Sequence, residues 1–217
     1  MKTAFLIAMI ACIIAYASAK KICFDKEFET RVVAFDPARE FDGFHHTYFS
    51  VKENKHRIDI HEFEPEPRRL SIYFRHDLQK MYFYDRHEEK CESQPLHGSL
   101  EPHCLASNAT MDGQIRFGHH LNSDVYTDYT EHGFRIRLVL SQVDNTPINL
   151  FVRGGHGHGA FLEEFFDWVH TVKDYSVFEL PEKCQHLTAE ATPSTISAKY
   201  QPYLKQAQKI AATYSKH

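Results

Sequence analysis

Two histidines in a glycine-rich stretch are the side chains most suited to transition-metal chemistry. The segment "GGHGHG" at residues 154–159 places His156 and His158 two positions apart. Neutral imidazole binds both zinc and copper, so the pair could hold a metal with a third ligand from elsewhere. The stretch lacks the lysine and the Ser or Thr of a phosphate-binding loop. We favour the simpler interpretation, which is the tip of a hairpin.

A second group of candidate ligands is acidic. In "NSDVYTDYTE", residues 122–131, a strand would place Asn122, Asp124 and Asp128 on one face. Hard oxygen ligands suit Ca²⁺, although the central glycine and terminal glutamate of an EF-hand are missing. We therefore predict calcium as a candidate cofactor, bound by Asp124 and Asp128, and no organic cofactor. The alternative is an acidic, solvated edge strand.

The sequence carries no recognisable catalytic motif. Neither G-x-S-x-G nor H-E-x-x-H occurs. The 25 Lys and Arg residues are dispersed among 29 Asp and Glu, so no nucleic-acid partner is indicated. We predict a protein that is not an enzyme. A hydrolase or metalloenzyme that uses His156 and His158 is the alternative.

The first 19 residues have the layout of a secretory signal peptide. Lys2 precedes an apolar run from Ala4 to Ile14, and Ala17-Ser18-Ala19 forms a small-X-small cleavage site. The run is shorter than the roughly 20 residues that a membrane-spanning helix needs. We expect cleavage after Ala19, secretion to the extracellular space and no transmembrane segment.

The remaining cysteines and one glycosylation sequon fit that compartment. Cleavage leaves an even number of cysteines, which allows three disulfide pairings. These residues are Cys23, Cys91, Cys104 and Cys184. Their long spacings are unlike those of a structural zinc site. Asn108-Ala109-Thr110 is the one usable sequon, so we predict a glycan on Asn108.

The chain alternates apolar and polar residues with a period of two, as strands with one buried face do. In residues 133–142, Ile136 and Leu138 alternate with Arg135 and Arg137. Similar runs occupy residues 28–35, 47–51, 56–63, 69–75, 80–86, 114–117, 124–129 and 148–152. The segment "AFLEEFFDWVH", residues 160–170, fits either a helix or a bulged strand.

About ten short strands predict an all-β fold with minor α-structure, in which antiparallel sheets close around a shared core. The 17 Phe and 11 Tyr would fill an aromatic core or line a cavity between sheets. We expect one domain over residues 20–186. A polar linker and an amphipathic C-terminal helix would follow within residues 187–217.

Two cysteine motifs carry a resemblance to a known family. The stretch "YDRHEEKCESQPLHGSLEPHCLASNATMDGQIRFG", residues 84–118, resembles the central motif of ependymin-related proteins. The segment "HTVKDYSVFELPEKC", residues 170–184, resembles the closing motif of that family. Nearer the N-terminus, "CFDKEFETRVVAFD" and "YFSVKENKHRIDIHEF" are similar to its first strand segments. The likeness runs from Cys23 to Cys184.

The resemblance implies a disulfide pattern and a fold. It pairs Cys91 with Cys184, and Cys23 and Cys104 then remain to form the second disulfide. It also implies two antiparallel sheets folded over a deep apolar cavity, as in bacterial lipoprotein carriers, with homodimers formed through sheet surfaces. Ependymin relatives are secreted glycoproteins associated with calcium, extracellular matrix, cell adhesion and apolar ligands.

We therefore predict a secreted, non-enzymatic glycoprotein that binds a fatty acid or other lipid between its sheets, with calcium as a candidate second ligand. The candidate cavity residues are the strand aromatics and aliphatics that we expect to point inward: Phe74, Phe83, Phe134, Ile136, Leu138 and Phe151. The alternative function is calcium-dependent adhesion to extracellular matrix or a cell surface, in which the cavity has no role.

Overall fold

The computed structural model describes residues 22–36, 41–62, 68–129, 133–154 and 160–187. These ranges contain eleven strands and two short helical turns. Their bounds are β1 (Glu27–Asp36), β2 (Phe41–Ser50), β3 (Lys55–Glu62), β4 (Arg68–Arg75), β5 (Lys80–Asp85), β6 (Lys90–Pro95), β7 (Thr110–Phe117), β8 (Leu121–Tyr129), β9 (Arg135–Ser141), β10 (Pro147–Arg153), β11 (Ala160–Val169), η1 (Tyr175–Phe178) and α2 (Glu182–Gln185).

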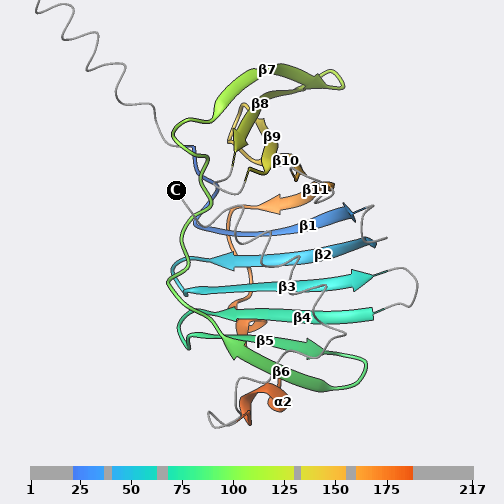
Figure 1. Cartoon of the computed structure of the whole chain (residues 1–217), viewed down its shortest axis with the longest axis vertical. Helices are drawn as coiled ribbons and strands as arrows, with labels where there is room; N and C mark the ends of the chain where they lie inside the picture. Colours follow the sequence, from blue (N-terminus) through green and yellow to red (C-terminus); the bar gives the residue numbers. More distant parts are fainter. Residues whose placement is uncertain (1–21, 37–40, 63–67, 130–132, 155–159, 188–217) are drawn as a thin grey trace, which may run out of the picture.

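All eleven strands belong to one antiparallel sheet, in the order β6-β5-β4-β3-β2-β1-β11-β10-β9-β8-β7. Two meanders, β1 to β6 and β7 to β11, join where β1 pairs with β11 (Figure 1). The all-β prediction is confirmed. The two expected sheets are halves of a single sheet, because the ladder continues across the junction, with Val32 opposite Phe165.

The sheet has two unlike faces, and β1 shows why. Buried Phe28, Thr30, Val32 and Ala34 alternate with exposed residues such as Val33. Successive side chains of a strand point to opposite faces, so the even-numbered residues of β1 define what we call the inner face. The opposite face is the outer face.

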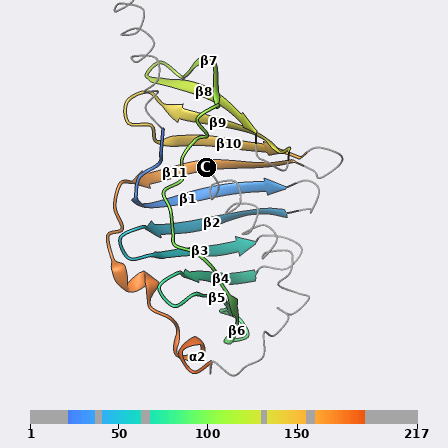
Figure 2. The ribbon, with the colours of Figure 1, turned by 60° about the vertical axis from the view of Figure 1, so that its left-hand side comes forward.

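A long connection crosses the inner face. Residues 96–109, which we call the strap, run from β6 at one end of the sheet to β7 at the other (Figure 2). Leu100 of the strap packs with Phe28 and Phe49 of the inner face. The Leu100 backbone N–H donates to the Asn54 side-chain oxygen at 2.8 Å. The strap therefore covers the centre of the inner face.

The C-terminal part of the described chain covers the outer face of the β1–β6 half. Cys184 on α2 is buried against Tyr73 and Tyr82. The Arg57 guanidinium donates to the Val177 carbonyl oxygen at 2.6 Å, which fixes η1 on β3. Figure 2 shows this segment descending from β11 along the sheet to α2.

A bulge in β11 places two aromatic side chains on the inner face. The register between β1 and β11 shifts near the start of β1, and Asp167 has a φ of 52°. An extra residue in one strand resets its alternation, so Phe165 and Trp168 both face inward although they are three positions apart. The Thr30 hydroxyl donates to the Phe166 carbonyl oxygen at 2.9 Å beside this interruption. Of the two interpretations of residues 160–170, the bulged strand is confirmed.

Several predicted features lie outside the described residues. They are the signal peptide at residues 1–19, the His156 and His158 pair, and the C-terminal helix within residues 187–217. Each stays a prediction.

Candidate functional site

A concave pocket of about 400 Å³, measured to its open mouth, lies between the strap and the inner face. Its floor comes from β1, β2, β3 and β11, and its cover comes from the strap and the segment before β1. The lining residues are Phe24, Phe28, Thr30, Val32, His45, Thr47, His56, Ile58, His103, Glu163, Phe165 and Trp168.

Trp168 is held firmly at the pocket wall. Its ring stacks on Phe28 with centroids 4.2 Å apart and meets Phe24 edge-on at 6.1 Å. The indole N–H donates to Asp25 Oδ2 at 3.0 Å, and His170 Nδ1 lies 2.7 Å from the same oxygen. A ring that is packed on its faces and hydrogen-bonded at its edge presents a fixed apolar wall.

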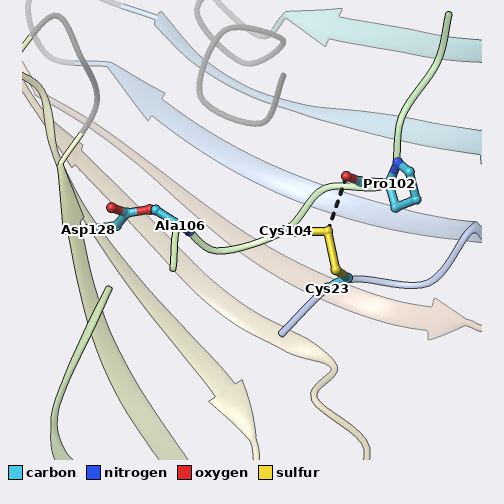
Figure 3. The surroundings of a disulfide bond; sticks show 5 residues. All are labelled: Cys23, Pro102, Cys104, Ala106 and Asp128. Atoms are coloured by element: carbon cyan, nitrogen blue, oxygen red, sulfur yellow. Dashed lines mark hydrogen bonds between the residues drawn. A yellow bond between two sulfur atoms is a disulfide. The ribbon is translucent and has the colours of Figure 1, made fainter. Parts of the chain in front are cut away.

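A disulfide ties the cover of the pocket together. Cys23 and Cys104 are bonded and form an isolated antiparallel bridge (Figure 3). Beside it, the Phe24 N–H donates to the His103 carbonyl oxygen at 2.7 Å. These contacts join the segment before β1 to the strap and place the Phe24 and His103 side chains over the inner face.

A second, smaller pocket lies on the other side of Phe24 and His103. It is lined by the strap and by β8, β9 and β10, and includes Ile136, Leu138 and Leu150. Both pockets share Phe24 and His103. The disulfide-bonded cover therefore divides the inner face into two apolar compartments.

The larger pocket also contains buried ionisable groups. Burial raises the pKa of Glu163 to about 8. Burial, with a smaller contribution from neighbouring His46, lowers the pKa of His45 to about 4. Burial likewise holds the pKa of His56 well below its ordinary value. Desolvation disfavours the charged form of each group, so all three are mostly neutral at pH 7.

The predicted cavity residues fall into three groups. Ile136 and Leu138 line the smaller pocket. Phe74 and Phe83 are buried in the inner-face core of the β1–β6 half, and Phe134 packs against the core of the other half. The sixth residue, Phe151, is partly exposed.

The prediction for Phe151 is wrong. Phe151 is 37% exposed, whereas its neighbours Leu150 and Val152 are buried in the inner-face core. Strand alternation turns Phe151 to the outer face when the residues on either side of it point inward.

The structure places the two candidate calcium ligands on β8. Asp124 Oδ1 accepts from the Gln114 and Gln142 amides at 3.1 and 2.6 Å. Asp128 is buried, and its oxygens accept from the backbone N–H groups of Ala106 and Tyr129. Figure 3 shows Asp128 facing Ala106 of the strap. Within the described ranges, no group of three or more His, Cys, Asp or Glu residues could hold a metal ion. Calcium stays a prediction.

The cysteines and the sequon lie where they can serve their predicted roles. Both disulfides that the resemblance implies are present, and the second joins Cys91 at β6 to Cys184 on the outer face. Asn108 is exposed in the turn at the end of the strap, just before β7. A glycan there would project into solvent.

Sequence reasoning missed the polar floor of the larger pocket. Glu163, His45 and Thr30 each fall on the buried side of a strand pattern, where a polar residue is unusual. A polar residue at a position that the strand pattern predicts to be buried was therefore the signal that the sequence offered. It depends on the register of β11, which the sequence left open between helix and strand.

The fold and pocket define a disulfide-bonded, all-β protein, built on one antiparallel sheet that carries apolar pockets on its inner face. The chain belongs to the ependymin family, since the family model named Ependymin matches residues 64–184. No curated protein matches the chain. No helix among the described residues is long and apolar enough to cross a membrane.

Among solved structures, the chain is similar to the crystal structure of an uncharacterized conserved protein from Thermus thermophilus. The TM-score is 0.52 at 10% sequence identity, over 74% of this chain and 88% of that chain. At that identity the likeness concerns the fold alone.

Proposed function

We propose that this ependymin-family chain is a secreted, non-enzymatic protein that binds an apolar, lipid-like ligand with an alkyl chain on its inner face. The observation that carries the proposal is the pocket walled by Phe28, Phe165 and Trp168 beneath the strap. Small-molecule sites are typically concave and mostly apolar, with a few polar groups that orient the ligand.

The energetics favour a ligand with an alkyl chain. Each buried CH₂ contributes about 0.8 kcal/mol, so eight carbons contribute roughly 6 kcal/mol. The loss of translational and rotational freedom costs at least about 4 kcal/mol. A short chain should therefore bind weakly, and a longer chain that buries more CH₂ groups should bind more tightly.

The test is native mass spectrometry of protein secreted from eukaryotic cells, with organic extraction of bound molecules. A lipid present near one per chain supports the proposal. If extraction yields nothing, and the delipidated protein binds no alkyl probe in titrations followed by Trp168 fluorescence, the proposal is wrong. Trp168 suits this readout because it is the single tryptophan and lines the pocket.

Secretion rests on two kinds of observation. Two disulfides between four cysteines are typical of oxidising compartments, and residues 1–19 have the pattern of a signal peptide. Intact-mass analysis of the secreted protein should show an N-terminus at Lys20 and a glycan on Asn108. Retention inside the cell would contradict this part of the proposal.

A homodimer through the outer face is the proposed assembly. Phe35 on β1, Leu162 on β11 and Phe151 on β10 form one cross-strand row, and Phe35 and Phe151 are exposed. Phe166, 47% exposed, extends this apolar surface along β11. A twofold dimer needs only one such surface, used by both copies.

Light scattering over a concentration series tests the dimer. Phe166→Ser should weaken association, whereas Val143→Ser should not, because exposed Val143 lies in the β9–β10 turn. A monomer mass at every concentration would contradict the proposal.

The alternative function is calcium-dependent adhesion to matrix or a cell surface, with Asp124 as the more accessible ligand. If this function is correct, Ca²⁺ should raise the melting temperature of EDTA-treated protein, and the substitution Asp124→Asn should remove that rise. If titration calorimetry detects no heat of binding at millimolar calcium, that result would count against the alternative function.

A further inference from the structure

Glu163 is a buried acid on the inner face of the sheet. It is 2% exposed and lines the larger pocket from β11. Its Oε1 atom has no hydrogen-bond partner within the described part of the chain. A buried polar atom without a partner costs roughly 1–3 kcal/mol, so a partner that arrives with a ligand would recover that free energy.

The other polar groups in the pocket define what such a ligand can carry. They are His45, His56, His103, Thr30 and Thr47. Burial keeps His45 and His56 neutral at pH 7, as their lowered pKa values indicate. The described lining contains neither Lys nor Arg. A ligand carboxylate would therefore be desolvated with no cation to pair with, whereas a ligand cation would meet Glu163.

We propose that the pocket selects an apolar amine, whose ammonium group pairs with the Glu163 carboxylate while its alkyl part packs on Phe28, Phe165 and Trp168. This inference rests on the proposed function, because it requires the pocket to admit an apolar ligand.

Binding moves one proton. Glu163 is mostly protonated in the empty pocket at pH 7, because burial raises its pKa to about 8. When an ammonium group docks, the carboxyl releases its proton to solvent and the ammonium keeps its own. No covalent bond of the ligand changes. Binding should therefore tighten as the pH rises from 6.5 to 8, where deprotonation of Glu163 becomes easier.

The experiment compares octylamine, octanol and octanoate as probes for the delipidated full chain, with Trp168 fluorescence as the readout. At pH 7.5 we expect octylamine to bind at least tenfold more tightly than octanol, and octanoate to bind most weakly. Calorimetry in buffers of different ionisation enthalpy should detect a proton released on octylamine binding at pH 7.

Glu163→Gln should remove the preference for octylamine and the proton release, and should leave octanol binding within about twofold. Glu164→Gln is the matched control, because the next residue along β11 is exposed on the other face. A folded Glu163→Gln protein that still prefers octylamine would overturn the inference. Octanol binding as tight as octylamine binding would also overturn it and would leave the proposed function standing. Binding of none of the three probes would overturn the inference, and together with an empty organic extract it would also refute the proposed function.

Discussion

Ala34 on β1 lies opposite Glu163 on β11, and Gly43 on β2 lies opposite Ala34. Leu150 on β10 completes this row on the far side of Glu163. None of these three neighbours has a polar side chain, so the cross-strand row offers the carboxyl no side-chain partner. The raised pKa of Glu163 follows from this register, because burial without compensation disfavours the carboxylate.

The first prediction concerns stability between pH 6.5 and 8. Over this interval the unfolded chain has lost the Glu163 proton, whereas the native state retains it up to a pKa of about 8. The free energy of unfolding should therefore fall with rising pH, by up to about 1.4 kcal/mol per pH unit from this group. Urea titrations of wild-type and Glu163→Gln protein measure the difference.

The comparison with the variant is needed because other groups also titrate. The lowered pKa values of His45 and His56 make the free energy of unfolding fall as the pH drops below 6.5. In that range their effect is opposite to that of Glu163. The hydrogen bond from His170 to Asp25 raises the pKa of that exposed imidazole and acts in the same direction as Glu163 above pH 6.5. Equal slopes for the two proteins would contradict the assignment to Glu163.

The second prediction separates the two disulfides. The Cys23–Cys104 and Cys91–Cys184 bonds join residues 81 and 93 positions apart. In the chain-entropy account, each stabilises the fold by roughly 4–5 kcal/mol. Replacing either cysteine pair with alanine should lower the denaturant concentration at the unfolding midpoint, and the two replacements should lower it by similar amounts.

Only the first replacement should alter the pocket. Phe24, next to Cys23, packs edge-on against Trp168, so loss of the Cys23–Cys104 bond should shift Trp168 emission to longer wavelength in the native state. The Cys91–Cys184 bond lies on the outer face and serves as the matched control. Unchanged emission after removal of Cys23–Cys104 would show that the strap stays in place without it.

Much of the sheet is predictable because its signal is local. In residues 133–142 the alternation of Ile136 and Leu138 with arginines identified a half-buried strand, and β9 has that pattern. The arrangement of strands is not local. Whether two meanders form one sheet or two depends on the pairing of β1 with β11, residues about 130 positions apart in sequence, and no alternation pattern records that pairing.

The candidate site was harder to predict than the sheet. Phe151 was predicted to point inward with the other strand aromatics, but its neighbours Leu150 and Val152 are the buried residues, so Phe151 lies on the outer face. The position of Trp168 depends on the bulge at Asp167, where the register between β1 and β11 shifts. A residue that gains its role from a register shift has no distinct signature in the sequence.

The third prediction concerns the outer-face segment. Arg57 donates to the Val177 carbonyl oxygen at 2.6 Å and to Asp59 Oδ1 at 2.8 Å, and its guanidinium lies over the Tyr73 ring. Arg57→Ala should cost about 2–3 kcal/mol, because it leaves buried acceptors with fewer donors. It should also speed hydrogen exchange at the amides of η1.

Arg31→Ala is the control for Arg57. The Arg31 and Asp167 side chains form an ion pair at 3.4 Å, and both are exposed. Exposed ion pairs contribute about 0–1 kcal/mol to the free energy of unfolding. If both variants lose equal stability, or if exchange at η1 is unchanged in Arg57→Ala, then Arg57 does not hold this segment on the sheet.

The fourth prediction concerns the exposed turn at Asn108. The Ala109 N–H donates to the Ala106 carbonyl oxygen at 3.0 Å, so the turn is held by its backbone while the Asn108 side chain faces solvent. Asn108→Gln should remove the mass of one glycan from protein secreted by eukaryotic cells, and change the free energy of unfolding by no more than about 0.5 kcal/mol. Thr110 tests the sequon itself: Thr110→Ser keeps the acceptor motif and should retain the glycan, whereas Thr110→Ala should lose it. Intact-mass spectra distinguish these results, and a glycan that persists in Thr110→Ala would have to lie on another residue.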